Sequence, residues 1–168
     1  MEEAIAEYDE AIRLNPQDAD AYYNRGNAYS DLGQPQQAIQ DYDRAIRLDP
    51  QLTLAYYNRG NAYRELGEHE RAIEDYDLAV HLNPQLAPAY YNRGNAYSDL
   101  GQPQRAIEDY DQAIRANPQL TQAYAGRALA YTILGDDIKA GQAVEQAIEL
   151  GFDQAILERL IEELKKQR

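Results

Sequence analysis

Apolar and small residues recur along the chain at the spacing of amphipathic helices. At about 100° per residue, two stripes each fall on one helix face, and they consist of Tyr22, Gly26 and Tyr29, followed by Ala38, Tyr42 and Ala45. Gly33 lies between the stripes and suits the left-handed conformation that ends a helix, and Pro35 fits the first turn of the helix that follows. The residue before Pro50 is disfavoured in a helix. The pattern therefore predicts a helix, a tight turn, a second helix and a short loop.

This helical pair repeats every 34 residues, the separation of Ala21, Ala55 and Ala89. We predict a partial repeat with only a second helix at 1–18, repeats 1 to 4 at 19–52, 53–86, 87–120 and 121–154, the last of them divergent, and a C-terminal capping helix at 155–168. No repeat can bury its stripes alone, so neighbouring repeats must stack. We expect nine helices and no strand, with the C-terminal segment as a tenth helix if it is ordered.

The residues shared by the repeats point to a known architecture. Positions are counted from the first residue of each repeat. Most repeats carry an aromatic ring at positions four, eleven and twenty-four and a small residue at position eight. They also carry alanine at positions twenty and twenty-seven and a proline near the end. This spacing resembles the tetratricopeptide repeat (TPR) family over essentially the whole chain. The resemblance implies an all-α, right-handed superhelical solenoid of antiparallel helix pairs, in which the first helices line the concave side. Two features depart from the family: position seven, usually apolar, is arginine, and Phe152 stands where the last proline is expected.

The exposed face of each first helix carries amide side chains at positions six and nine. They are Asn24, Asn27, Asn58, Asn61, Asn92 and Asn95. An amide offers a donor and an acceptor together, so a ladder of amides can hold the main chain of an extended peptide. The alternative is that these asparagines only keep the surface polar. Tyr23, Tyr57 and Tyr91 at position five either line the same groove or pack against the adjacent repeat.

The arginines at position seven, Arg25, Arg59, Arg93 and Arg127, lie at the edge of the buried stripe and need acidic partners. We interpret them as structural links between repeats, with ligand binding as the alternative. The fourth repeat has Ala143 where the others have an acid at position twenty-three. We therefore predict pairing with the acid at position twenty-three of the preceding repeat, which gives Arg25–Glu7, Arg59–Asp41, Arg93–Asp75 and Arg127–Asp109. The acids at position twenty-five, Asp9, Asp43, Asp77 and Asp111, remain as rival partners.

Repeat 4 differs from the others on its exposed face, where Ala125, Leu129 and Ile133 form an apolar patch. This patch either receives an apolar side chain of a ligand or is covered by the C-terminal segment, and we favour the second. That segment reads as an amphipathic helix of the kind that caps solenoids.

The N-terminal partial repeat carries the stripe Ala4, Tyr8 and Ala11, which matches the stripe that whole repeats bury. Part of this stripe has no expected cover within the chain. We expect either a helix from a larger parent protein or a second copy of the chain to pack there, so self-association is the alternative function.

Charge narrows the range of partners. The chain has 29 acidic and 16 basic side chains, a net charge of −13, which disfavours binding to nucleic acid. It has no cysteine and no apolar run long enough to cross a membrane, so we expect a cytoplasmic protein. No catalytic, cofactor or metal-binding pattern stands out. We therefore expect a non-enzymatic scaffold that binds a protein or peptide in its groove, with neutral or basic segments preferred.

Overall fold

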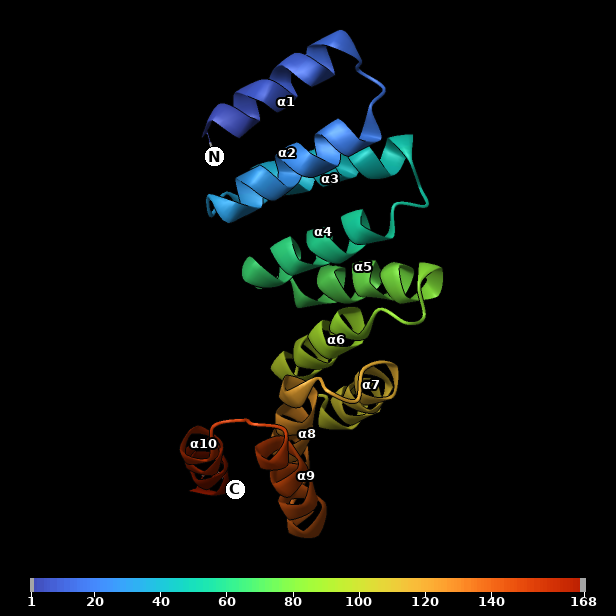
Figure 1. Ribbon diagram of the computed structural model, residues 1–168. Helices are drawn as coiled ribbons and strands as arrows, with labels where there is room; N and C mark the ends of the chain where they lie inside the picture. Colours follow the sequence, from blue (N-terminus) through green and yellow to red (C-terminus); the bar gives the residue numbers. More distant parts are fainter. Residues whose placement is uncertain (1, 167–168) are drawn as a thin grey trace. The chain divides into compact units, whose positions relative to one another are not determined.

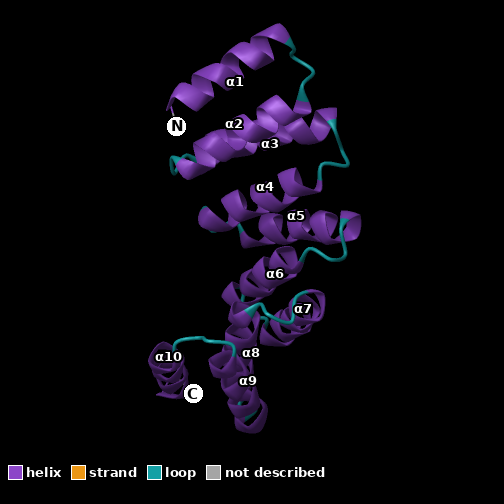
Figure 2. Cartoon of the chain, in the orientation of Figure 1, coloured by secondary structure: helices purple, strands orange, loops and turns teal. Residues whose placement is uncertain are grey.

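The computed structural model describes residues 2–166, and over this range the chain forms helices and connecting turns without any strand (Figures 1 and 2). Ten helices follow one another: α1 (Glu2–Leu14), α2 (Ala19–Asp31), α3 (Pro35–Leu48), α4 (Thr53–Glu65), α5 (His69–Leu82), α6 (Ala87–Asp99), α7 (Pro103–Ala116), α8 (Thr121–Leu134), α9 (Asp137–Glu149) and α10 (Gln154–Lys166). These helices confirm the predicted all-α array of helix pairs, and the C-terminal segment supplies the tenth.

The helices belong to two compact units, Met1–Asn83 and Pro84–Arg168. In the first unit, α2 pairs with α3 and α4 pairs with α5, while α1 packs on α2 and α3 packs on α4. In the second unit, α6 pairs with α7 and α8 pairs with α9, α7 packs on α8, and α10 also packs on α8. Each unit therefore contains stacked helical hairpins with contacts that are local in sequence.

Glycines end the first helix of each hairpin, as the sequence predicts. The residues that follow these helices with positive φ are Gly33, Gly67, Gly101 and Gly135. Pro35 and Pro103 occupy the first turn of α3 and α7, where a missing backbone N–H costs nothing. Gly151 also has a positive φ, at the end of α9, which the sequence pattern did not identify.

A tyrosine ring packs directly on a glycine of the facing helix in each of the first three repeats. A Cβ added to Gly26 would lie 2.7 Å from Cε1 of Tyr42, and one added to Gly60 would lie 2.8 Å from Cε1 of Tyr76. Both rings are fully buried. The glycine therefore makes room for the ring of the second helix, which explains its place in the middle of a helix despite a poor helix propensity.

Helix α10 covers the apolar patch of repeat 4. Leu157 is fully buried in a cluster with Ala125 and Ala147, and Leu129 packs against this cluster. Ile133 stays 43% exposed. The C-terminal segment, rather than an open surface, therefore meets most of the patch.

Candidate functional site

Three of the asparagines predicted to bind a peptide line one pocket in the first unit. The pocket has a volume of about 340 Å³ and lies between α2, α3 and α4. Its lining residues are Asn27, Ser30, Asp31, Tyr42, Asn58 and Asn61. This pocket is the candidate functional site, because it joins amide, hydroxyl and carboxylate groups in one solvent-accessible hollow.

Internal hydrogen bonds fix the amides of this pocket. The hydroxyl of Tyr42 donates to Oδ1 of Asn27 at 2.9 Å, and Nδ2 of Asn58 donates to the same oxygen at 2.8 Å. Nδ2 of Asn58 also reaches the hydroxyl of Tyr23 at 3.2 Å. Both lone pairs of the Asn27 oxygen are thus used, so this amide can offer a ligand only its N–H groups.

The bond between tyrosine and asparagine recurs in the next two repeats. Tyr76 donates to Asn61 at 2.7 Å and Tyr110 donates to Asn95 at 2.8 Å. At position nine, the amide oxygen therefore accepts a hydrogen bond from its own repeat, which the sequence interpretation did not foresee. Asn24 and Asn92 lie half-buried on α2 and α6 and do not line the pocket.

The tyrosine hydroxyls remain protonated donors at neutral pH. Burial raises the pKa of Tyr42 and of Tyr76 above the ordinary value of 10.0; the charge of Asp31 adds to this rise at Tyr42, and that of Arg64 opposes it at Tyr76. Each hydroxyl therefore keeps donating its hydrogen bond to the asparagine oxygen that faces it throughout the physiological pH range.

The tyrosines at position five pack against the same rings. The ring centroids of Tyr23 and Tyr42 are 6.1 Å apart with a tilt of 43°, and the pairs Tyr57–Tyr76 and Tyr91–Tyr110 have nearly the same geometry. This ring packing lies within one repeat rather than between neighbouring repeats. The contact to the next repeat is the hydrogen bond that the Tyr23 hydroxyl accepts from Asn58.

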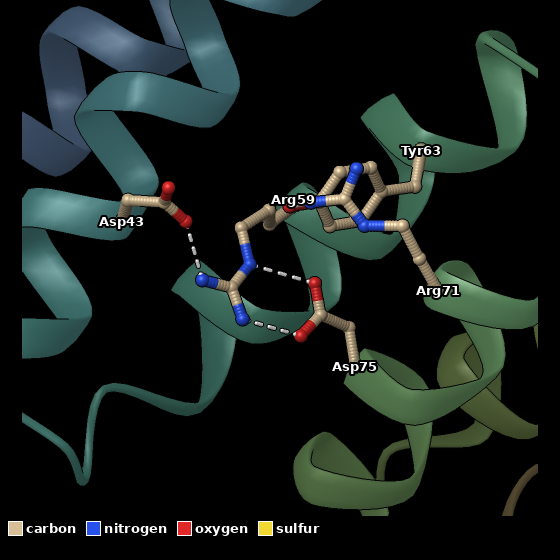
Figure 3. Close-up of polar contacts among 5 residues, drawn as sticks. All are labelled: Asp43, Arg59, Tyr63, Arg71 and Asp75. Carbon is tan, nitrogen blue, oxygen red and sulfur yellow. Dashed lines mark hydrogen bonds and ion pairs between the residues drawn. The ribbon is translucent and has the colours of Figure 1, made fainter. Parts of the chain in front are cut away.

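Three of the four arginines at position seven, Arg25, Arg59 and Arg93, form forked ion pairs, and Figure 3 shows that of Arg59. Nε and NH2 of Arg59 donate to the two carboxylate oxygens of Asp75 at 2.8 and 2.6 Å, and NH1 donates to Asp43 at 2.5 Å. Asp75 lies on α5 of the same repeat, whereas Asp43 lies on α3 of the preceding repeat. One guanidinium therefore joins three helices.

The predicted pairing with position twenty-three of the preceding repeat was wrong, whereas the rival acids Asp9, Asp43 and Asp111 at position twenty-five do link neighbouring repeats. Arg25 binds Asp41 and Asp9 rather than Glu7, Arg93 binds Asp109, and Arg127 binds Asp111 and Gln146. Positions twenty-three and twenty-five diverge by about 200° on a helix, so they face different neighbours. Position twenty-three faces the first helix of its own repeat, and position twenty-five faces the next repeat. A guanidinium has donors for two carboxylates, so Arg25 and Arg59 each bind one acid of their own repeat and one of the preceding repeat.

The charge state of the Arg59–Asp75 pair follows from this geometry. Burial by itself lowers the pKa of the Arg59 guanidinium, but the hydrogen bonds and charges of Asp75 and Asp43 outweigh it and raise the pKa. Burial raises the pKa of the Asp75 carboxyl, and the hydrogen bonds from Arg59 oppose this rise. The pair is ionic at neutral pH, because the guanidinium holds its proton and donates two short hydrogen bonds to the carboxylate. Beside it, the Arg71 guanidinium stacks on the Tyr63 ring, 3.9 Å from its centroid (Figure 3).

Helix α1 leaves its apolar stripe partly open. Among Glu2–Leu14, no residue is buried, and Ala4, Tyr8 and Ala11 are each half-buried. In α3, the residues at the corresponding positions are fully buried. The three predicted self-association residues therefore share one accessible helix face.

Sequence reasoning missed two residues of the pocket, Ser30 and Tyr42. Tyr42 was assigned to a buried stripe, and its ring is buried, but its hydroxyl reaches the pocket wall. Asp31 lies at position thirteen of the exposed face, so its place on the helix wheel was a usable signal. No helix in the range 2–166 is long and apolar enough to span a bilayer. Over the same residues, no cluster of acidic or histidine side chains is arranged to hold a metal ion.

Comparisons with known proteins agree with this architecture. Models of the tetratricopeptide repeat match residues 19–52 and 87–120 and also 41–74, and a TPR repeat model matches 1–33 and 60–101. A search of curated proteins finds no match.

Solved structures that resemble this chain include a crystal structure of MamA. That protein is 31% identical, with 87% of this chain and 85% of that chain covered and a TM-score of 0.84. Another is MamA 41-end from Desulfovibrio magneticus RS-1, which is 26% identical, with 89% of this chain and 84% of that chain covered and a TM-score of 0.84. Together with the helical hairpins, these matches show that the chain belongs to the tetratricopeptide repeat family and is a protein-interaction scaffold.

Proposed function

We propose that the chain binds an extended segment of a partner protein, and that the pocket lined by Asn27, Asn58 and Asn61 receives part of that segment. The observation that carries the proposal is that these asparagines lie together with Asp31 around one hollow of about 340 Å³. No catalytic step is required for this role.

The pocket offers groups that suit a polypeptide backbone. The oxygen of Asn27 is occupied, so its Nδ2 is left to donate to a carbonyl of the ligand. Nδ2 of Asn58 is occupied in turn, so its oxygen is left to accept from an amide N–H. The internal bonds hold both amides in place before binding, which reduces the entropy lost when a ligand is ordered.

The charge around the pocket favours neutral or basic segments. Asp31 is exposed and is the one charged residue that lines the pocket, and the whole chain carries a net charge of −13. A lysine or arginine in the ligand would reach Asp31 while the ligand backbone contacts the amides. An acidic segment would be repelled.

A displayed library of short random peptides tests this proposal. We expect panning against the chain to enrich peptides with lysine or arginine among neutral residues. Asp31→Asn should weaken binding of these peptides about threefold, because an exposed ion pair contributes about 0.2 to 1 kcal/mol. Glu108→Gln, which removes one exposed acid from α7 outside the pocket, is the matched control and should leave binding unchanged.

Asn58→Ala should weaken the same peptides modestly, since one neutral hydrogen bond is worth about 0.5 to 1.5 kcal/mol. Far-ultraviolet circular dichroism must show that this variant still folds, because Asn58 also bonds Asn27 and Tyr23. If enriched peptides bind Asp31→Asn and Asn58→Ala as tightly as the parent chain, the pocket is not their site and the proposal fails.

We propose self-association through α1 as the alternative function, supported by the half-buried state of Ala4, Tyr8 and Ala11 where the matching residues of α3 are buried. A second copy that packed on this face would bury the Tyr8 ring. Sedimentation equilibrium should then show association that grows with concentration and is lost in Tyr8→Glu. A chain that stays monomeric at every concentration would rule this alternative out.

A further inference from the structure

Repeat 4 lacks the carboxylate that completes the arginine fork in the other repeats. Asp41, Asp75 and Asp109 are buried, and each accepts two hydrogen bonds of 2.6 to 2.8 Å from Nε and NH2 of its arginine. Ala143 occupies the corresponding position in α9 and contributes only a methyl group. The acceptor of the fork is therefore missing from this one repeat.

Arg127 nevertheless keeps the place of the other arginines. Its side chain is 17% exposed, against 19%, 17% and 16% for Arg25, Arg59 and Arg93. NH1 donates to Asp111 at 2.6 Å and NH2 donates to Oε1 of Gln146 at 2.7 Å. Nε is buried and has no acceptor among the described residues. A buried N–H group of a charged side chain is unfavourable when it has no acceptor. A ligand that supplies an acceptor oxygen to Nε of Arg127 is therefore favoured.

A cavity lies beside Arg127 and Ala143. It has a volume of about 370 Å³, and its lining includes Arg127, Ala143 and Gln146. Gln146 and Lys139 line it and are exposed, so the cavity reaches the surface. In repeat 2 the corresponding cavity beside Arg59 already contains the carboxylate of Asp75 among its walls. The cavity in repeat 4 therefore combines space with an arginine that is short of one acceptor.

The charges around the cavity make hydrogen-bond geometry the main source of selectivity. Lys139 adds a positive charge but is paired with Asp136 at 2.9 Å, and the carboxylates of Glu145 and Glu149 also line the cavity. All four groups belong to residues that are exposed or half-buried, so water screens their effects. Selectivity therefore comes from the planar guanidinium of Arg127, whose Nε and NH2 groups match the two oxygens of a carboxylate.

We propose that this cavity binds one carboxylate group, which takes the position of the absent aspartate and accepts hydrogen bonds from Nε and NH2 of Arg127. Because Nε is buried in the unliganded chain, the exposed side chain of Gln146 has to move aside, which releases NH2 and gives the ligand access to Nε. An acidic side chain of a partner polypeptide and a small free carboxylate have this chemistry in common. The site shares no residue with the asparagine pocket and does not depend on the function proposed for it.

The resonance of the Arg127 Nε–H group in a nitrogen–proton NMR spectrum tests the proposal, with Arg127→Lys used to assign it. At constant ionic strength, sodium acetate should shift this resonance saturably, with half-saturation on the order of 1 to 10 mM. The Nε–H of Arg93 is the internal control and should not move, because it already donates to Asp109 at 2.7 Å. A blocked peptide with one central glutamate is the second probe, and its glutamine counterpart is the control.

Ala143→Asp provides the decisive variant, since it restores the internal carboxylate and should stabilise the fold. Its Arg127 resonance should lie near that of Arg93 and no longer respond to acetate. A response to acetate alone identifies a small carboxylate as the ligand, and a response to the glutamate peptide but not to its glutamine counterpart supports a polypeptide source. The proposal is overturned if neither probe shifts Arg127, if Arg93 shifts equally, or if Ala143→Asp responds like the parent chain.

Discussion

Removal of the Asp75 carboxylate tests the energetic role of the arginine forks. Asp75→Ala leaves Arg59 buried with only Asp43 as an acidic partner, which reproduces in repeat 2 the arrangement that occurs naturally around Arg127. The substitution removes two charge-assisted hydrogen bonds of 2.8 and 2.6 Å from a nearly buried site.

The expected loss follows from these contacts. Hydrogen bonds to charged groups contribute about 1.5 to 3 kcal/mol each, and breaking a buried ion pair costs about 3 to 5 kcal/mol. Because Asp43 still neutralises part of the charge of Arg59, we expect about 3 kcal/mol, at the lower end of this range. Glu10→Ala removes the exposed pair with Arg13, and we expect no measurable loss from it.

Urea unfolding followed by far-ultraviolet circular dichroism measures the loss, with data fitted to a nearest-neighbour model because separate repeats need not unfold together. A double-mutant cycle with Arg59→Met isolates the pairwise energy. If Asp75→Ala costs less than about 1 kcal/mol, or if the coupling with Arg59→Met is near zero, then the fork does not stabilise the repeat and the reasoning from its geometry is refuted.

Three further predictions concern packing and ionisation. Gly60→Ala should destabilise the fold by about 1 to 3 kcal/mol, because the new methyl group would lie 2.8 Å from the Tyr76 ring. Gly141→Ala should stabilise it by about 0.5 to 1 kcal/mol, because nothing lies within 4 Å of the added carbon. Equal effects of the two variants in urea unfolding would contradict this prediction. Leu157→Ala should cost about 2 to 5 kcal/mol in the same assay, since Leu157 is fully buried where α10 meets α8, and a loss below about 1 kcal/mol would show that α10 is only loosely attached. Stability should fall as pH rises above 10.0, the ordinary tyrosine pKa, because tyrosines of the unfolded chain ionise there while the raised pKa of Tyr76 keeps this residue neutral in the folded chain. The urea midpoint should therefore decline less steeply with pH in Tyr76→Phe. An identical decline in both chains would show that Tyr76 does not cause the loss.

The sequence was sufficient for the helices and the turns because local residues determine both. Gly33 and Pro35 mark the end of one helix and the start of the next through their own backbone preferences. The fit between glycine and tyrosine was only half predicted. The sequence pattern indicated close approach at Gly26, but not that the ring of Tyr42 would fill the space.

The partners of polar side chains could not be predicted in the same way. A helix wheel gives the direction of Arg25 but not the distance to each neighbouring helix, and so it could not rank Glu7 against Asp41. The occupied state of the Asn27 oxygen likewise depends on how far the Tyr42 hydroxyl extends across the hairpin. Both outcomes depend on the spacing between helices, which emerges only when the hairpins pack.

The arginine forks also have a consequence for the order in which repeats open. Arg59 of repeat 2 binds Asp43 of repeat 1 as well as Asp75 of its own repeat, so local unfolding of repeat 1 would leave the buried Arg59 guanidinium short of one anion. Such shared ions couple the opening of adjacent hairpins and make it cooperative. In repeat 4 the bond from Arg127 to α9 ends on the neutral amide of Gln146. Helix α9 therefore lacks the buried carboxylate that ties α3, α5 and α7 to the arginine of the preceding helix, so no shared buried ion couples its opening to that of α8.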